Sequence, residues 1–522
     1  MTHPKQITLR WLCCLLVLAL AVGYVHAQAG SQGSIAVTVA DSTGGQIPQA
    51  SLELVEKATN YPHKAVTSEK GSYTFVNLNI GDYQLTVTKT GYATTVLESV
   101  TVHASQTTDI VAPLKIGQTQ ETVSVSADMM PLIDVTTNSI GSVIDLKWIE
   151  DLPVIGRNLT SLALLTPGFT GNVTGGAGGT LGYGVWNGQP FSNQSSNVDG
   201  TVGGPTRGKY TGDVSPSATP RVENIAEMSV ETDQLDLDQG FGQASMAVNY
   251  VTRSGSNDFH GRVYVDARNS GLFANTYAHN VSGQRRTKVI WNDFGGSAGG
   301  PIKHDKLFFF GSLSTRRIPG GLDNSNNYLT SAMQAGNYSY LGTDGNTHTV
   351  NLLTLANQYN TANSTSLPTA VNSEIASQFS AINTAIGSGS TLSTSDLNIG
   401  EVDWASSAPN IYYYPTIKLD YNLSDKIRMN LAWNMTNQTQ KGAYAPPFPG
   451  SGFSDQGGQY HTRGYTASYG LDWDIKPTLL NQFKVGYLYN VHQYATDAKQ
   501  LYATDPYVYW GLDGYGFNYA MS

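Results

Sequence analysis

The chain has 522 residues and a formal net charge of −9, with 55 glycines, 30 tyrosines and two cysteines. This length allows several domains, and an acidic chain without a basic patch lacks the electrostatic footprint of a nucleic-acid-binding protein. No apolar run as long as a transmembrane helix follows residue 27, so a membrane span would have to be built from strands.

The first 27 residues are predicted to be a secretory signal peptide. Lys5 and Arg10 precede the apolar run Trp11 to Val25, and Ala27 supplies a small residue before a cut at Gln28. A basic start, a short apolar run and a small residue at the cut are typical of secretion signals, with an uncleaved anchor as the alternative.

Cleavage at that point would leave a mature chain without cysteine. Cys13 and Cys14 are the only two cysteines, and both lie inside the signal. We therefore expect no disulfide and no thiolate metal site. The mature net charge would be −11, because residues 1–27 contain two basic residues and no acidic one.

Residues 33–117 alternate short β-type runs with turn residues. Seven such runs in about 85 residues are typical of a small β-sandwich. The runs are Ile35 to Val39, Ala50 to Glu56, Lys64 to Ser68, Ser72 to Val76, Tyr83 to Lys89, Thr94 to His103 and Thr107 to Leu114.

The same region resembles the carboxypeptidase regulatory-like domain, a transthyretin-like sandwich. The resemblance rests on GSIAVTVADSTGGQIPQASLEL, which begins at Gly33, and on EKGSYTFVNLNIGDYQLTVTKTGY, Glu69 to Tyr92. It implies an accessory domain and not the zinc peptidase of the same name. Related sandwiches bind carbohydrate, so sugar binding is an open possibility for this domain.

An extended segment, GQTQETVSVSAD, connects the sandwich to the next region. Its part ETVSVSA resembles a TonB box and consists of Glu121, Thr122, Val123, Ser124, Val125, Ser126 and Ala127. An unpaired, β-prone strand can be captured by addition to the sheet edge of a partner, which would here be the periplasmic protein TonB. The alternative is that the segment is only the first strand of the next domain.

Residues 129–257 are predicted to form an α+β domain. Leu146 to Leu152 and Asn158 to Leu165 have helical patterns. The Gly-rich loop Gly171 to Gly188 lacks the Lys-Ser/Thr ending of a phosphate-binding loop, which favours a flexible loop. Across Gly240 to Gly261 the pattern changes to strict alternation, and this change predicts the boundary with a large antiparallel sheet.

The later part of the chain contains long runs with one apolar, aromatic-rich face and one polar face. In one of them Met429, Leu431 and Trp433 point one way while Asn430 and Asn434 point the other. Runs of about ten residues or more are long enough to cross a bilayer at a tilt. The seven predicted strands are 259–269, 287–300, 306–318, 411–423, 426–438, 461–475 and 478–494.

The connections between these strands alternate between short and long. Short turns on one side and long loops on the other are typical of outer-membrane barrels, as is the concentration of 16 tyrosines in residues 411–522. The tight turns lie near Lys303, Ser424 and Lys476, and the long links are 270–286, 319–410 and 439–460.

Four segments in a fixed order resemble the plug and opening barrel hairpin of Oar-like TonB-dependent receptors. They are LPVIGRNLTSLALLTPG (Leu152 to Gly168), NVDG (Asn197 to Gly200), the stretch Val222 to Gly261, and GGPIKHDKLFFFGSLSTRR (Gly299 to Arg317). Receptors of this kind have 22 strands and a terminal aromatic residue. Seven strands and an end at Ser522 lead us to expect the N-terminal part of a longer receptor.

The expected fold is therefore mainly β, with the first strands of an antiparallel transmembrane β-barrel. The predicted organisation is a signal peptide (1–27), a β-sandwich (28–117), a linker with the TonB-box-like segment (118–128), a plug (129–257) and a partial outer-membrane barrel (258–522).

Enzymatic chemistry and cofactors are not expected. No His-Glu-x-x-His motif occurs, and the ten histidines are scattered. Gly295 to Gly299 matches a nucleophile elbow by letters but lies in a β-run without a following helix. Asp233, Asp236 and Asp238 do not have the EF-hand spacing, so an acidic turn is expected rather than a metal site.

The resemblance implies a transporter of the outer membrane whose N-terminal domain faces the periplasm. Its partners would be TonB, membrane lipid and an extracellular ligand such as a carbohydrate, a peptide or a siderophore. The alternative is an adhesion or carbohydrate-binding surface protein without transport. A secreted carboxypeptidase-like enzyme is a third possibility, weakened by the lack of metal ligands.

Overall fold

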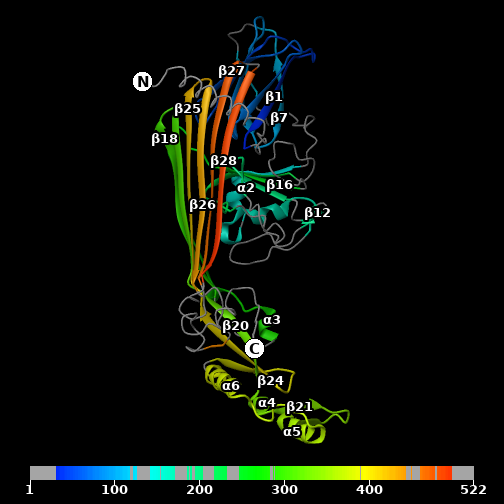
Figure 1. Ribbon diagram of the computed structural model, residues 1–522. Helices are drawn as coiled ribbons and strands as arrows, with labels where there is room; N and C mark the ends of the chain where they lie inside the picture. Colours follow the sequence, from blue (N-terminus) through cyan, green and yellow to red (C-terminus); the bar gives the residue numbers. More distant parts are fainter. Residues whose placement is uncertain are drawn as a thin grey trace, which may run out of the picture.

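The computed structural model describes residues 31–117, 122–125, 141–231 and 246–495, with internal gaps at 153, 171–184, 187–188, 191–193, 204–216, 282–285, 287–288, 388, 442–447, 450–458 and 477–478. A tall, curved sheet of seven long strands forms one side of the molecule (Figure 1). A β-sandwich lies at one end of it, a mixed α/β unit lies against it, and a folded insert lies at the other end (Figure 1).

The sandwich is built from two sheets, with orders β4-β1-β7 and β3-β2-β5-β6-β8. Period-two alternation buries Ile35, Val37 and Val39 of the first strand in a core that contains sandwich residues alone. The predicted sandwich is confirmed, with an eighth strand added. The strands are β1 (Gly33–Asp41), β2 (Ser51–Glu56), β3 (Pro62–Val66), β4 (Ser72–Leu78), β5 (Gly81–Thr88), β6 (Thr94–Val102), β7 (Thr107–Leu114) and β8 (Thr122–Val125).

The next unit, called the plug here, has a five-stranded sheet of order β14-β13-β16-β15-β9 and a small sheet of order β10-β11-β12. Asp145 caps the one α-helix described in this unit by accepting a hydrogen bond from the Trp148 N–H. The second predicted helix is a 3₁₀ helix, η4. The elements are β9 (Gly141–Ile144), α2 (Leu146–Asp151), η3 (Ile155–Arg157), η4 (Leu159–Leu165), β10 (Phe169–Thr170), β11 (Val185–Trp186), β12 (Gln189–Pro190), β13 (Gln194–Val198), β14 (Thr201–Val202), β15 (Ile225–Glu231) and β16 (Met246–Thr252).

The seven-stranded sheet, called the wall here, is antiparallel throughout, with order β17-β18-β19-β25-β26-β27-β28. Its strands lie within a few residues of the predicted ones. They are β17 (His260–Asn269), β18 (Ile290–Lys303), β19 (Leu307–Ile318), β25 (Asn410–Ser424), β26 (Ile427–Lys441), β27 (Gln459–Lys476) and β28 (Leu479–Ala495). In the described part of the chain the two edge strands, β17 and β28, do not pair with each other.

The wall has its polar face covered and its apolar face open. On β27, Thr466 and Ser468 are 2% and 3% exposed, whereas Val263 of β17 is 88% and Phe483 of β28 is 53% exposed. A water-soluble sheet hides its apolar face, so this arrangement suits a wall that faces lipid outside and a polar filling inside.

The predicted long loop 319–410 is a folded insert rather than an irregular connection. Its helix α6 packs Ala385 and Ile386 against Val402 in a small core. The elements of this insert are β20 (Gly321–Leu329), α4 (Ser331–Gln334), β21 (Asn337–Leu341), β22 (Thr347–Asn351), α5 (Leu352–Asn363), α6 (Ser373–Ile386), β23 (Ser390–Ser393) and β24 (Ile399–Ser407). The first long link holds η8 (Ser270–Leu272) and α3 (Tyr277–Val281). None of the helices described is long and apolar enough to cross a membrane.

Candidate functional site: the plug and its contacts with the wall

Arg221 is a plug residue whose side chain reaches into the wall. It begins a turn before β15, in which Asn224 Oδ1 accepts from its backbone N–H at 2.8 Å. Its guanidinium is 1% exposed and donates from Nη2 to Asp293 Oδ1 of β18 at 2.6 Å. The Tyr264 hydroxyl of β17 donates to the same carboxylate at 2.7 Å, so three elements meet at Asp293.

A second arginine completes this contact from the wall. Arg316 of β19 donates from Nε to Asp293 Oδ2 at 3.0 Å, and the Gly156 carbonyl accepts from both Arg221 and Arg316. Gly156 has φ +66°, and a Cβ there would lie 2.9 Å from Arg316 Nη2. Glycine is therefore required both by the backbone angle and by the close guanidinium.

Two further charges lie beside this group on the plug. Arg157 pairs with Glu223, whose other carboxylate oxygen lies 3.8 Å from Arg221 Nε. We call Arg157, Arg221, Glu223, Asp293 and Arg316 the arginine cluster. Its charges are largely removed from water, so each carboxylate is needed to offset the cost of burying the guanidinium groups. The cluster fixes the plug against one defined position on the wall.

A hairpin of the plug forms a second polar contact with the wall. The turn of β13 and β14 has φ +49° at Asp199 and +72° at Gly200, a backbone that suits a tight two-residue hairpin. Asp199 accepts from the Thr252 backbone and hydroxyl at 2.8 and 2.6 Å. From the wall, Asn434 donates to Asp199 at 3.2 Å and Lys418 donates to the Thr252 carbonyl at 2.9 Å.

Two glycines of the wall let the plug backbone approach closely. A Cβ at Gly464 would lie 2.2 Å from the Ser217 carbonyl oxygen, and one at Gly486 would lie 2.4 Å from Thr201 Oγ1. Any side chain there would displace the plug from the wall.

The sandwich touches the short-turn end of the wall through polar groups. Arg428 donates to the Asn77 carbonyl at 2.7 Å, and Asn60 donates to Asp305 at 2.9 Å. The sandwich also contacts the plug, where His103 Nδ1 lies 2.8 Å from Glu227 Oε2. The hydrogen bond to Glu227 raises the pKa of His103 above its usual value, against the opposing effect of burial.

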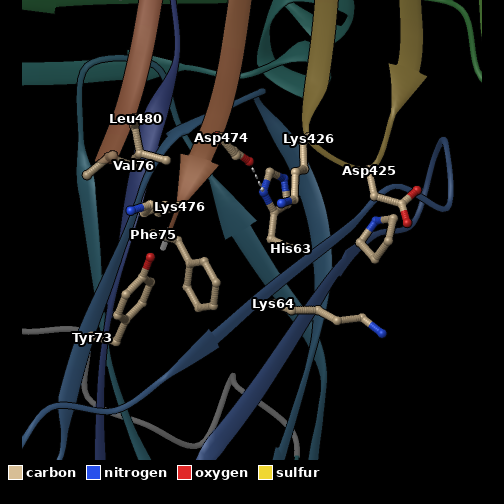
Figure 2. Close-up of a pocket in the computed structure, with 11 residues that line it drawn as sticks. His63, Lys64, Tyr73, Phe75, Val76, Asp425, Lys426, Asp474, Lys476 and Leu480 are labelled. Carbon is tan, nitrogen blue, oxygen red and sulfur yellow. Dashed lines mark ion pairs between the residues drawn. The ribbon is translucent and has the colours of Figure 1, made fainter. Parts of the chain in front are cut away.

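A cavity of about 280 Å³ lies between the sandwich and the wall turns (Figure 2). His63, Tyr73 and Phe75 line it from the sandwich, and Asp474 faces it from the wall. Burial, followed by the nearby Arg428 charge, holds the pKa of His63 well below its usual value. His63 is therefore neutral near pH 7, and its 3.9 Å approach to Asp474 is a dipolar contact rather than an ion pair.

A larger cavity, of about 400 Å³, lies where sandwich, plug and wall meet. Glu56, His103, Asp199, Glu227 and Lys418 contribute to its lining, which brings several carboxylates together. Burial raises the pKa of Glu56. No group of three or more residues able to hold a metal ion occurs among the residues described.

The TonB-box-like segment is paired in the structure. Thr122 to Val125 form β8, which runs parallel to β6 from Thr94 to Leu97 at the edge of the sandwich sheet. The segment is thus neither a free strand nor the first strand of the plug sheet. Glu121, Ser126 and Ala127 lie outside the described residues.

The other candidate sites named from the sequence fall partly inside and partly outside the described regions of the chain. Gly295 to Gly299 lie inside strand β18, with no helix directly after them. Ala27, Gln28, the aspartates at 233, 236 and 238, and most of the loop Gly171 to Gly188 lie outside the described residues.

Sequence reasoning did not single out the arginine cluster. The sequence signal for this cluster is a charged residue at an inward position of a predicted strand, as at Asp293 and Arg316. The ion-pair partner of such a residue cannot be assigned without the fold. Asp199 and Gly156 lie within the motifs quoted above, where the sequence does not indicate their carboxylate and carbonyl roles.

Two family models match separate parts of the chain. The family model "Outer membrane beta barrel domain" covers residues 251–520, and "Carboxypeptidase regulatory-like domain" covers residues 34–115. The first match spans more than half of the chain, and so the chain belongs to the outer-membrane β-barrel family and is located in the outer membrane.

A curated relative is similar over part of its length. The chain is 27% identical over 320 residues to the TonB-dependent transporter Oar of Myxococcus xanthus, which makes it an Oar homologue. The match covers 57% of this chain and 28% of the relative, so the chain spans well under half of that protein's length.

Two solved structures are also similar over part of their length. The transporter YddB of Escherichia coli has 12% identity and a TM-score of 0.44, over 68% of this chain and 40% of YddB. The siderophore receptor PirA of Acinetobacter baumannii has 14% identity and a TM-score of 0.38, over 67% of this chain and 40% of PirA.

Proposed function

We propose that this chain acts as a TonB-dependent transporter: an extracellular ligand binds at the insert and the plug, and TonB drives its import. The observation that carries the proposal is the plug, which is fixed to the polar face of the wall by hydrogen bonds and ion pairs rather than by a shared apolar core. Such contacts can be exchanged for water, so a plug held by them can be moved.

The charge of the insert indicates which class of ligand would bind to it. Residues 319–409 contain six carboxylates and neither lysine nor arginine. An acidic surface repels anions, so a neutral carbohydrate or a peptide suits this insert better than an anionic ferric siderophore.

The proposal is tested by disabling the segment Thr122 to Val125. Val123→Pro/Val125→Pro removes two backbone N–H donors, and Val123→Ala/Val125→Ala keeps them. In outer membranes incubated with the purified periplasmic domain of TonB, we expect the proline variant to bind TonB at least 10-fold more weakly than the parent chain. The alanine variant should bind within about 3-fold of it.

Transport is measured with fluorescent neutral oligosaccharides and short peptides in cells with and without TonB. We expect a probe to accumulate with the alanine variant and not with the proline variant. Equal TonB binding by both variants would refute the role of this segment. Surface binding of a probe without TonB-dependent accumulation would favour the alternative, an adhesion or carbohydrate-binding protein.

A further inference from the structure

The link that connects the plug to the wall is held against the turn between β18 and β19. It runs from the end of β16 to the start of β17. A Cβ at Gly255 would lie 2.4 Å from the Phe309 carbonyl oxygen, so the link passes in close contact with β19. Asn257 Nδ2 then donates to Asp305 Oδ1 at 2.8 Å, and Asn257 Oδ1 accepts from the Asp305 N–H at 2.9 Å. A plug that moves away from the wall pulls on this link.

The sandwich holds the same link and the same turn. The Asn257 backbone N–H donates to the Ala58 carbonyl at 2.9 Å. Asn60 Nδ2 donates to Asp305 Oδ1, also at 2.9 Å. Ala58 and Asn60 lie in the loop between β2 and β3, where Asn60 has φ +57°, an angle that asparagine tolerates better than most residues. One carboxylate oxygen of Asp305 therefore accepts from both the sandwich and the link.

This loop of the sandwich is held in shape by its own strand. Thr59 Oγ1 donates to Glu56 Oε2 at 2.7 Å, and the Asn60 N–H donates to the Glu56 carbonyl at 2.8 Å. Glu56 and Thr59 are both buried. Tyr61, which follows the loop, donates from its hydroxyl to the Ser424 carbonyl at 3.2 Å, at the next short turn of the wall. The loop is therefore a preformed part of the sandwich that contacts two turns of the wall.

A second region of the sandwich contacts the plug itself. Glu227 of β15 accepts from the Ala104 N–H at 2.6 Å with Oε1, in addition to its contact with His103. Figure 1 shows the sandwich at the short-turn end of the wall, beyond the plug. The sandwich thus contacts the plug, the link and the turns of the wall at the same time.

We propose that the sandwich is an intramolecular lock on the plug. While the sandwich stays on the turns of the wall, the link at Asn257 stays closed, and release of the plug requires the sandwich to leave the turn at Asp305 first. The hydrogen bonds at Asp305 are exposed, so water can replace them once the sandwich is pulled. This inference goes beyond the proposed function, because it assigns a task to the sandwich and requires neither TonB nor a ligand.

A covalent bridge between the sandwich and the wall tests the inference. Asn60→Cys/Asp305→Cys replaces two side chains whose polar atoms are 2.9 Å apart, and a short, reducible bifunctional thiol reagent joins the two sulfurs. The two natural cysteines lie in the predicted signal peptide. Gln84→Cys/Glu98→Cys is the matched control, because these two exposed side chains form a 2.8 Å hydrogen bond within the sandwich.

The measurement is amide hydrogen exchange of the plug strands β15 and β16 by mass spectrometry. The full chain is held in lipid vesicles, in urea too dilute to unfold the sandwich, and is compared bridged and after reduction. Amide exchange reports how often these strands open. We expect the bridge to slow their exchange by about 3-fold or more, because it keeps the lock closed. A smaller slowing, or an equal one in the bridged control, would show that the plug opens with the sandwich in place and would overturn the inference.

A variant without cysteine keeps the test decisive where the bridged pair fails to fold. Asn60→Gly removes the hydrogen bond to Asp305 and keeps the left-handed backbone that Asn60 adopts. We expect it to speed the exchange of β15 and β16 by about 3-fold, which the loss of one hydrogen bond can supply. Gln84→Ala removes a hydrogen bond within the sandwich alone and should leave that exchange unchanged. Equal exchange in Asn60→Gly and Gln84→Ala would refute the lock, and neither result depends on TonB.

Discussion

The arginine cluster makes a quantitative prediction for Asp293→Asn. The substitution leaves Arg221 and Arg316, each 1% exposed, without the carboxylate that they share. Removing one partner of a buried ion pair costs about 3–5 kcal/mol. We expect the lower end of that range, about 3 kcal/mol, because the Gly156 carbonyl still accepts from both guanidinium groups.

The assay follows release of the plug in lipid vesicles. A fluorophore on Lys147→Cys, an exposed residue of α2, reports the environment of the plug as urea is raised. Asp266→Asn is the matched control, because Asp266 pairs with Asp293 across the two strands but is exposed. We expect the control to change the free energy of release by less than about 0.5 kcal/mol, as is usual for surface sites.

A triple variant tests whether the loss of stability in Asp293→Asn comes from uncompensated buried charge. Arg221→Met, Asp293→Leu and Arg316→Met together remove the buried charges along with their partner. If the cost of Asp293→Asn arises from uncompensated charge, this variant is less destabilised than the single one. The reasoning is refuted if Asp293→Asn costs less than about 1 kcal/mol, or if the triple variant is the less stable of the two.

Two other residues give tests of the wall and of the sandwich contact. Val485→Arg puts a charge on the open apolar face of β28 and should destabilise the protein in lipid vesicles by about 2–4 kcal/mol, with Val485→Leu as the control and no loss as the contrary result. The pKa of His103 is raised in the folded chain, so its pairing with Glu227 stabilises fully below about pH 6.5 and the contribution is lost as the pH rises through the folded value. His103→Asn should therefore lower stability to urea at pH 5.5 and change it little at pH 8.5, and an equal effect at both would contradict this origin.

The wall was predictable because a strand in a barrel has a period of two. The inward set that contains Asn434, Thr466 and Ser468 is buried, and the outward set that contains Leu431 and Trp473 is exposed. Periodicity fixes which face a residue occupies but not which strand lies beside it. The pairing of β8 with β6 could not be predicted, since the alternation of ETVSVSA is the same for a free and a paired strand.

Two other features depended on contacts between distant residues. Asp293 and Arg221 are 72 positions apart, and nothing local to either identifies the other. The sequence predicts only a long link at 319–410, and its content of Asn, Ser and Thr is ordinary for a solvated loop. In the structure, helix α5 of the insert has no buried residue, and the core comes from α6, β24 and Phe448. Polar composition predicted its exposure to water and did not predict its fold.

The separation of the apolar cores bears on how this protein can move. The sandwich cluster and the plug cluster contain no residue in common and none from the described strands of the wall. Plug, sandwich and wall therefore share no apolar cluster and meet through many polar groups. Phe308 and Phe310 on the covered face of β19 are 0% and 1% exposed, so separating the units also exposes some apolar surface of the wall. Each lost hydrogen bond costs about 0.5–1.5 kcal/mol net, because water replaces the partner.

The arginine cluster is the exception to that low cost. Its charges are already buried, so separating Arg221 from Asp293 leaves charge behind in the wall until water enters. Hydrogen bonds such as that of Asn434 with Asp199 can be replaced by water one at a time. The ion pairs of the arginine cluster separate only when water enters the buried site. A plug held in this way stays bound to the wall under thermal motion. It is released when a directed pull lets water reach the arginine cluster.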